Sequence, residues 1–195
     1  MKKLIFTLLV VLFANNFLIA QKKHVERYDN GTIEETGFFN EYDEKTGEWI
    51  EYYENGQLES IGSYFEDEKD GDWKEYYEDG QLYSSGSYKN GKENGKWIEY
   101  YEDGQIENIG SYVRGYKDGE WKMYYENGKL ESSGNYLHHM EGTFGSALDG
   151  RKHGLWKYYN ENGKLESVGS YIQGNKEGKW IYYSLNGEVL KTENY

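Results

Sequence analysis

Aromatic, aliphatic and glycine positions recur along this chain with a period of 24 residues. One of the intervals is longer by 11 residues. Counted from each Trp, a Tyr follows after three residues, a Gly after seven, an aliphatic residue after nine and a second Tyr after fifteen. In five of the six copies a Gly also follows after thirteen residues. The Trp and Gly concerned are Trp49, Trp73, Trp97, Trp121, Trp156 and Trp180, with Gly62, Gly86, Gly110, Gly134 and Gly169. A fixed period of this length predicts a repeat architecture.

The residues around one dipeptide in each copy predict a β-hairpin. Asn-Gly or Asp-Gly, as at Asn55-Gly56 and Asp79-Gly80, is flanked by aromatic and β-branched residues and favours a two-residue type I′ turn. This loop would place each Trp opposite the Gly thirteen residues later. The residue after the Trp would then face the one twelve later, and these partners change together: Ile50/Ile61, Lys74/Ser85, Ile98/Ile109, Lys122/Ser133, Lys157/Val168 and Ile181/Thr192. Such covariation between facing residues supports the register.

Side-chain alternation along a strand predicts two different faces. One face carries the Trp, the second Tyr of each Tyr-Tyr pair, the aliphatic residue, the Gly and the last Tyr. The other carries the residue after the Trp, the first Tyr and four glutamates, Glu59, Glu107, Glu131 and Glu166. The Gly opposite each Trp leaves room for the indole to lie across the backbone. We therefore expect an all-β fold, a single-layer antiparallel meander of about seven stacked hairpins.

The first residues differ from the repeats and predict export. Residues 1–20 combine Lys2 and Lys3 with an apolar run and Ala20 at a plausible cleavage point, which is typical of a helical signal peptide. The alternative is an uncleaved membrane anchor. The sequence contains no Cys, so attachment of a lipid to Cys is excluded. We expect a periplasmic or secreted protein, cleaved after Ala20.

Residues 21–195 are expected to form one repeat domain. Residues 24–39 are a degenerate first copy with His24 at the Trp position, as end repeats are often atypical. Residues 137–151 hold an insertion, interpreted as a longer loop or a small extra hairpin.

Charge narrows the classes of partner. The full chain has a net charge of −13, and without residues 1–20 it has 20 basic and 35 acidic residues, a net charge of −15. Nucleic acids and anionic membrane surfaces both require positive charge, so neither is expected as a partner. An unknown protein partner with basic character fits this charge better.

The stretch Gly86 to Tyr101, Gly-Ser-Tyr-Lys-Asn-Gly-Lys-Glu-Asn-Gly-Lys-Trp-Ile-Glu-Tyr-Tyr, resembles the MORN repeat. It is most similar to the bacterial variant with Tyr-Tyr-x-x-Gly-x-Leu, and the resemblance covers residues 24–195. It implies a scaffold of stacked hairpins used for protein or lipid contact, with no fixed ligand. Some proteins of that group are described as antitoxins, a cytoplasmic role that the export signal does not favour. The chain is also similar, less closely, to choline-binding repeats, which are shorter.

Three sets of residues are candidates for chemistry. The tyrosines Tyr53, Tyr77, Tyr101 and Tyr125 could stack against sugars or anchor a protein, whereas the Trp rows are expected to be the core. The turn acids Glu54, Glu78, Asp79, Glu102, Asp103 and Glu126 could hold Ca²⁺ weakly, but turn chemistry and solubility explain them better. His138, His139 and His153 lack further ligands for a metal site and are interpreted as a solvated loop.

No motif of a nucleophile, phosphate loop or metalloprotease occurs, so neither an enzyme nor a cofactor is expected. The hypothesis is an exported, non-enzymatic scaffold for protein–protein interaction in the cell envelope. The alternatives are an envelope glycan-binding module that uses the aromatic rows, and a toxin-neutralising protein.

Overall fold

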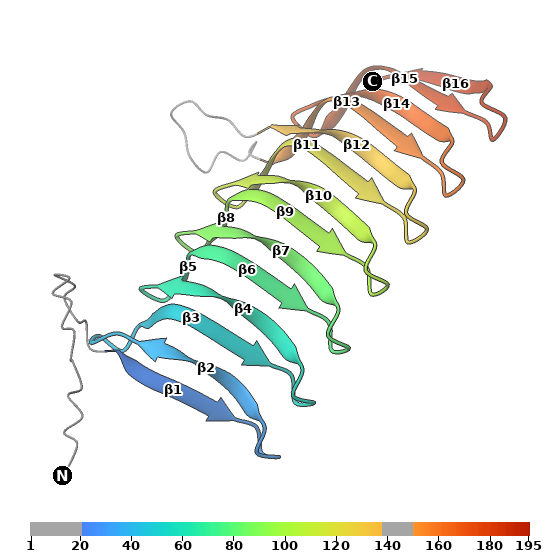
Figure 1. The fold of residues 1–195 in the computed structure, drawn as a ribbon. Coiled ribbons are helices and arrows are strands. Elements are labelled where there is room, and N and C mark those ends of the chain that lie inside the picture. The colour runs from blue at the N-terminus through green and yellow to red at the C-terminus, as the bar shows by residue number, and fades with distance from the viewer. Residues whose placement is uncertain (1–20, 138–149) are drawn as a thin grey trace, which may run out of the picture.

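A computed structural model describes residues 21–137 and 150–195, which form one open antiparallel sheet and contain no helix. Consecutive strands are neighbours throughout, and two short strands, β5 and β8, pair beside the main path (Figure 1). The strands are β1 (Lys22–Arg27), β2 (Ile33–Phe39), β3 (Lys45–Tyr52), β4 (Leu58–Phe65), β5 (Glu68–Lys69), β6 (Gly71–Tyr76), β7 (Leu82–Lys89), β8 (Lys92–Glu93), β9 (Gly95–Tyr100), β10 (Ile106–Val113), β11 (Tyr116–Tyr124), β12 (Leu130–Leu137), β13 (Arg151–Tyr159), β14 (Leu165–Ile172), β15 (Asn175–Tyr183) and β16 (Val189–Asn194). The all-β meander is thus confirmed. The expected signal helix over 1–20 lies outside the described residues.

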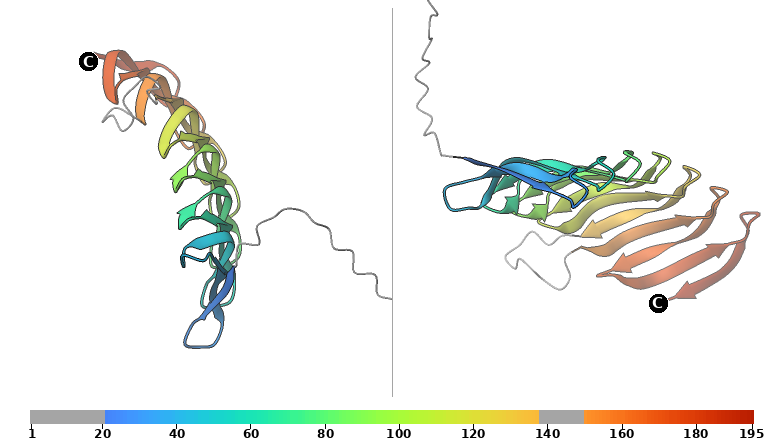
Figure 2. Two further views of the ribbon diagram at one scale, coloured as in Figure 1. Left: turned by 90° about the vertical axis from the view of Figure 1, so that its left-hand side faces the viewer. Right: turned by 90° about the horizontal axis from the view of Figure 1, so that it is seen from below.

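The sheet is a long twisted ribbon one layer thick. The loops within hairpins follow one long edge and the connections between hairpins follow the other, with β1 and β16 at opposite ends (Figure 1). Two further views show the accumulated twist and the absence of a second layer over the described strands (Figure 2). A single layer has to bury its apolar side chains against one another along one face.

The predicted register within hairpins is confirmed. Trp97 pairs with Gly110, and Ile98 with Ile109. The other five facing pairs expected from the sequence also occur. The degenerate first copy follows the same rule, since His24 pairs with Gly37.

The loop inside each hairpin, however, is not the predicted two-residue type I′ turn. Gly56 N–H donates to Tyr53 O, and Tyr53 N–H donates to Gln57 O, which closes a three-residue loop. Gly56 has a φ of +84°, whereas Asn55 is not among the residues with positive φ. This is a type I turn followed by a left-handed glycine, a common three-residue hairpin loop.

A bulge in the second strand restores the predicted register. Tyr52 pairs with Leu58 but Glu51 pairs with Ser60, so Glu59 is an extra residue. The longer loop and the bulge shift the pairing by one residue each, in opposite senses. The predicted faces of two positions were wrong for this reason: Leu58 shares the face of Tyr52, and Glu59 lies on the Trp face.

Type I′ turns do occur, but between hairpins. Both central residues have positive φ in four two-residue turns: Glu66-Asp67, Asn90-Gly91, Arg114-Gly115 and Gln173-Gly174. Beyond each turn the register slips. Ile109 pairs with Lys122 and Ser111 with Asp118, so that residues 119–121 face a single residue of β10. The predicted insertion lies at this edge, where Leu137 pairs with Arg151, and residues 138–149 lie outside the described part.

This slip decides which indole covers which glycine. A carbon placed on Gly110 would overlap Cγ, Cδ2 and Cε2 of Trp121, the Trp of the following hairpin, rather than its paired Trp97. The same offset holds for Gly37, Gly62, Gly86, Gly134 and Gly169. The expectation that each indole lies over its paired glycine is therefore corrected by one hairpin. All six indoles are 0–5 % exposed and form the core.

Candidate interaction surface

The Trp face carries a continuous row of aromatic rings. Each Trp contacts, edge to face, the last aromatic ring of its own hairpin and that of the preceding hairpin, as in Tyr112–Trp121 at 5.1 Å and Trp121–Tyr136 at 6.1 Å. The row begins with His24 and Phe39, which contact Trp49, and continues to Tyr195. Such pairs contribute about 0.5–1.5 kcal/mol each beyond the burial of their area. The rings therefore hold the hairpins together and are not a free binding ladder.

Five of the six indoles are held by a hydrogen bond and by a lysine over the ring. Trp121 Nε1 donates to Ser111 O at 3.1 Å, and Trp49, Trp73, Trp156 and Trp180 make the equivalent bond to the preceding hairpin. A lysine four residues before the Trp places its ammonium over the ring, with Lys117 Nζ 4.0 Å from the centre of Trp121. The other lysines are Lys45, Lys69, Lys152 and Lys176. This is a cation–π contact, favoured by the negative ring face.

One hairpin departs from this arrangement. At the lysine position before Trp97 the chain has Glu93. The indole of Trp97 is turned, so that Cε3 and Cζ3 lie nearest Gly86, and within the described residues its Nε1 makes no hydrogen bond. A carboxylate is repelled by the ring face that attracts an ammonium. This row of lysines was not predicted from the sequence, although the lysines recur there at a fixed distance before the tryptophans.

Carboxylates line the Trp face beside the rings. Glu51 Oε2 accepts a hydrogen bond from the buried Ser60 at 2.8 Å. Glu75 and Glu99 are bonded in the same way to Ser84 and Asn108. In the later hairpins Met123, Tyr158 and Tyr182 take this position, so the acids are concentrated in the first half of the ribbon.

The bulge residues add to this negative charge. Glu59 lies in a shallow hollow with Glu51, Ser60 and Lys69. Partial burial, and then the neighbouring carboxylates led by Glu51, raise the pKa of Glu59. Burial and Glu99 likewise raise the pKa of Glu107, against a hydrogen bond from Asn108. Like charges thus lie close together on a surface that remains accessible.

The four tyrosines proposed as a binding surface are half-buried and hold neighbouring hairpins together. Tyr53 Oη donates to Tyr76 O at 2.6 Å, and Tyr101 Oη donates to Tyr124 O at 2.5 Å. Tyr77 and Tyr125 make the same bond to the following hairpin. Burial is the main cause of the raised pKa of Tyr101, with Glu107 next. Their rings remain candidates for contact with a partner, but their hydroxyls are already engaged.

The other candidate residues occupy different places. The turn acids are exposed, and Asp103 shows their role: its Oδ1 accepts from Gln105 N–H at 2.9 Å, which lowers the pKa of Asp103. His153 lies on β13 opposite Asn135. His138 and His139 lie outside the described residues.

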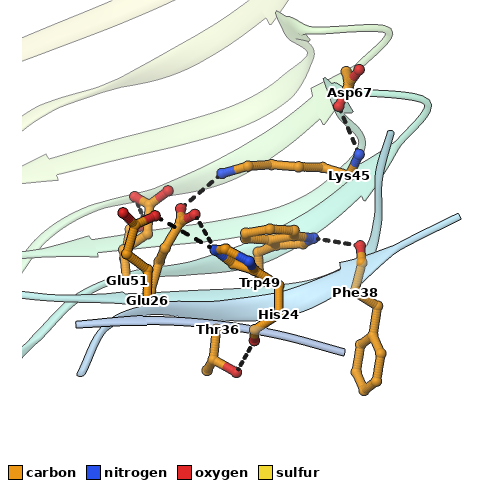
Figure 3. Close-up of polar contacts among 10 residues, drawn as sticks. His24, Glu26, Thr36, Phe38, Lys45, Trp49, Glu51 and Asp67 are labelled. Carbon is orange, nitrogen blue, oxygen red and sulfur yellow. Dashed lines mark hydrogen bonds and ion pairs between the residues drawn. The ribbon is translucent and has the colours of Figure 1, made fainter. Parts of the chain in front are cut away.

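The first hairpin has its own cluster of polar groups. His24 Nε2 lies 2.9 Å from Glu35 Oε1 and 3.6 Å from Glu26 Oε2. Lys45 Nζ donates to the other oxygen, Glu35 Oε2, at 2.9 Å, and Thr36 Oγ1 donates to His24 O (Figure 3). From the sequence, His24 was identified only as the residue that replaces Trp in the first copy.

Comparison with known families agrees with this repeat. The sequence model of the MORN repeat variant matches six consecutive segments, 45–66, 69–90, 93–114, 117–138, 152–173 and 176–195. The chain belongs to the MORN repeat variant family. Each matched segment begins at the position that carries the lysine over the ring, or Glu93 in the third. The hairpin β1–β2 lies before the match.

MORN repeats act as scaffolds for protein or membrane contact, and the family is generally non-enzymatic. No curated protein matches the chain. Within the described part, no helix is long and apolar enough to cross a membrane.

Proposed function

We propose that this MORN repeat protein is an exported scaffold of the cell envelope that binds a protein partner through the Trp face. Export rests on residues 1–20 alone, whose charged start, apolar run and Ala20 are typical of a signal peptide. The partner is an extended or flat protein segment that carries lysine or arginine. The accessible carboxylates of the Trp face are the observation that carries this proposal.

Burial of the aromatic row favours a protein over a sugar as the partner. Sugar-binding platforms present open ring faces, whereas the indoles here are at most 5 % exposed and covered by neighbouring tyrosines and lysines. The exposed groups of the same face are mainly charged. A surface of charged groups over covered rings gives a sugar no ring face to stack on, whereas it can attract basic groups of a protein partner.

Charge also indicates the character of the partner. Without residues 1–20 the net charge is −15, and Glu59 and Glu107 have other carboxylates nearby, Glu51 and Glu99 foremost. Basic groups of a partner would relieve this repulsion. Attraction of this kind mainly raises the association rate and weakens as salt screens the charges.

The proposal is tested by affinity capture from envelope extract with immobilised residues 21–195, followed by binding of the purified partner. The test variant carries Glu59→Gln, Glu107→Gln and Glu131→Gln on the Trp face. The control carries Glu48→Gln, Asp72→Asn and Glu120→Gln, which remove the same charge from the other face.

We expect the test variant to bind the partner at least tenfold more weakly at low salt, and the control to bind like the unchanged chain. Equal loss in both variants would mean that net charge alone matters. Saturable binding to a glycan array, lost in Tyr101→Ala, would favour the sugar-binding alternative and overturn the proposal.

A further inference from the structure

The first hairpin brings three potential metal ligands together on the Trp face. His24 Nε2 and one carboxylate oxygen each from Glu26 and Glu35 all lie within 4.8 Å of one another. The carboxylates belong to directly opposite residues of β1 and β2. Like charges directly opposite each other destabilise a strand pair unless a cation lies between them.

Comparison with the other hairpins shows that this cluster is particular to the first one. Glu26 has counterparts in the next three hairpins, but there the opposite residue is Ser60, Ser84 or Asn108, a neutral group that donates a hydrogen bond to the acid. In the first hairpin that donor is replaced by Glu35. The Trp is replaced by His24 at the same time. Both replacements exchange a group that cannot bind a metal well for one that can.

We propose that His24, Glu26 and Glu35 bind a divalent transition-metal ion of the zinc type. One imidazole nitrogen and two carboxylate oxygens are ligands that Zn²⁺ accepts, and water or a partner group would complete four-coordination. Ca²⁺ fits less well, because it takes six to eight oxygen ligands. No ion is required to build the cluster, since the side chains are already adjacent.

The surroundings hold these ligands in place. Lys45 bonds to Oε2 of Glu35 and leaves Oε1 directed toward His24, as an outer partner of a metal-binding carboxylate does. The imidazole packs on Phe39 at 5.1 Å and on Trp49 at 5.5 Å, which restricts its orientation. A bound ion would therefore join β1 to β2 at the open end of the sheet without rearrangement of the rings.

The test uses residues 21–195 with His138, His139 and His153 replaced by Asn, so that His24 is the sole histidine. Zn²⁺ is titrated by calorimetry, and the melting temperature is measured with and without Zn²⁺. Glu35→Ser is the informative variant, because serine is what four other hairpins carry at this position. Glu59→Gln is the control, an acid removed from the same face outside the cluster.

We expect one Zn²⁺ per chain, a higher melting temperature with Zn²⁺, and affinity at least tenfold weaker in Glu35→Ser but unchanged in Glu59→Gln. The double variant His24→Trp with Glu35→Ser restores the residues of the other hairpins and keeps the fold testable, and it should not bind. The proposal is overturned if the unchanged cluster gives no heat and no shift in melting temperature. It is equally overturned if Glu35→Ser binds Zn²⁺ as tightly as its parent, which would mean that Lys45 and His24 alone balance the acids. Neither result bears on the protein partner proposed above, which is tested on the other acids.

Discussion

Substitution of Gly110 by alanine tests the offset between glycines and indoles. The added methyl group would overlap three carbons of Trp121 and force the indole away from the backbone. Overpacking of this kind costs about 1–3 kcal/mol. A displaced indole would also lose the hydrogen bond from Trp121 Nε1 to Ser111 O, worth about 0.5–1.5 kcal/mol. We expect Gly110→Ala to lower the free energy of unfolding by about 2–4 kcal/mol.

Two backgrounds decide which indole is responsible. Urea unfolding followed by far-UV circular dichroism would be measured for Gly110→Ala alone, with Trp121→Ala, and with Trp97→Ala. Groups in contact show a coupling energy, whereas groups that do not touch behave additively. With Trp121 removed, the methyl group has room and the cost of Gly110→Ala should nearly vanish. With Trp97 removed, the full cost should remain.

The opposite pattern would refute this account of the packing. A cost that disappears when Trp97 is removed would mean that each indole lies over its paired glycine. Ser111→Ala is the matched control at the neighbouring residue. It should change the free energy of unfolding by well under 1 kcal/mol, because Ser111 contributes its carbonyl and not its side chain to the hydrogen bond from Trp121 Nε1.

Three further outcomes are expected. Glu93→Lys should raise the melting temperature, because an ammonium over Trp97 contributes about 0.5–1 kcal/mol. The control Lys92→Ala, at the neighbouring position, should not raise it. An unchanged melting temperature in Glu93→Lys would mean that the missing lysine is not the reason why the indole of Trp97 is turned. Tyr101→Phe should cost about 0.5–1.5 kcal/mol in urea unfolding, since Tyr124 O loses its donor, and no cost would mean that the bond contributes nothing to stability. Burial, followed by the charge of Glu51, raises the pKa of Tyr64 to about 12, above its ordinary 10.0. The stability that depends on its proton should be complete below about pH 10 and be lost as the pH rises through 12, which tyrosinate absorbance and thermal melts across that range would check.

The strand register was predictable because it leaves a trace in covarying neighbours, such as Ile98 with Ile109. The length of the hairpin loop was not predictable, because two deviations from the predicted hairpin cancel. A three-residue loop and the bulge at Glu59 together give the same pairing as a two-residue loop would, so agreement at Ile50 and Ile61 could not distinguish them. The faces of Leu58 and Glu59 depend on the bulge itself and were therefore missed.

The candidate site was less predictable than the fold. Period and residue type identified the tyrosines at 53, 77, 101 and 125, but the carbonyls that accept their hydrogen bonds belong to the next hairpin and become adjacent only on folding. The cluster of the first hairpin likewise depends on Glu26 lying opposite Glu35. A sequence shows which residue departs from a repeat, whereas only the pairing shows that two departures meet.

The offset of one hairpin between glycine and indole gives the ribbon a direction. Each hairpin supplies a bare strip of backbone to the one after it and places its own indole on the one before it. The two ends should then be irregular in opposite ways. The first hairpin has His24 in place of a Trp but has Gly37, over which Trp49 lies. The last described hairpin has Trp180 over Gly169 and carries Glu193, in place of a glycine, opposite Trp180. Removal of the first hairpin would therefore strip an indole of its support, whereas removal of the last would uncover only a glycine, so damage at the two ends has unequal consequences.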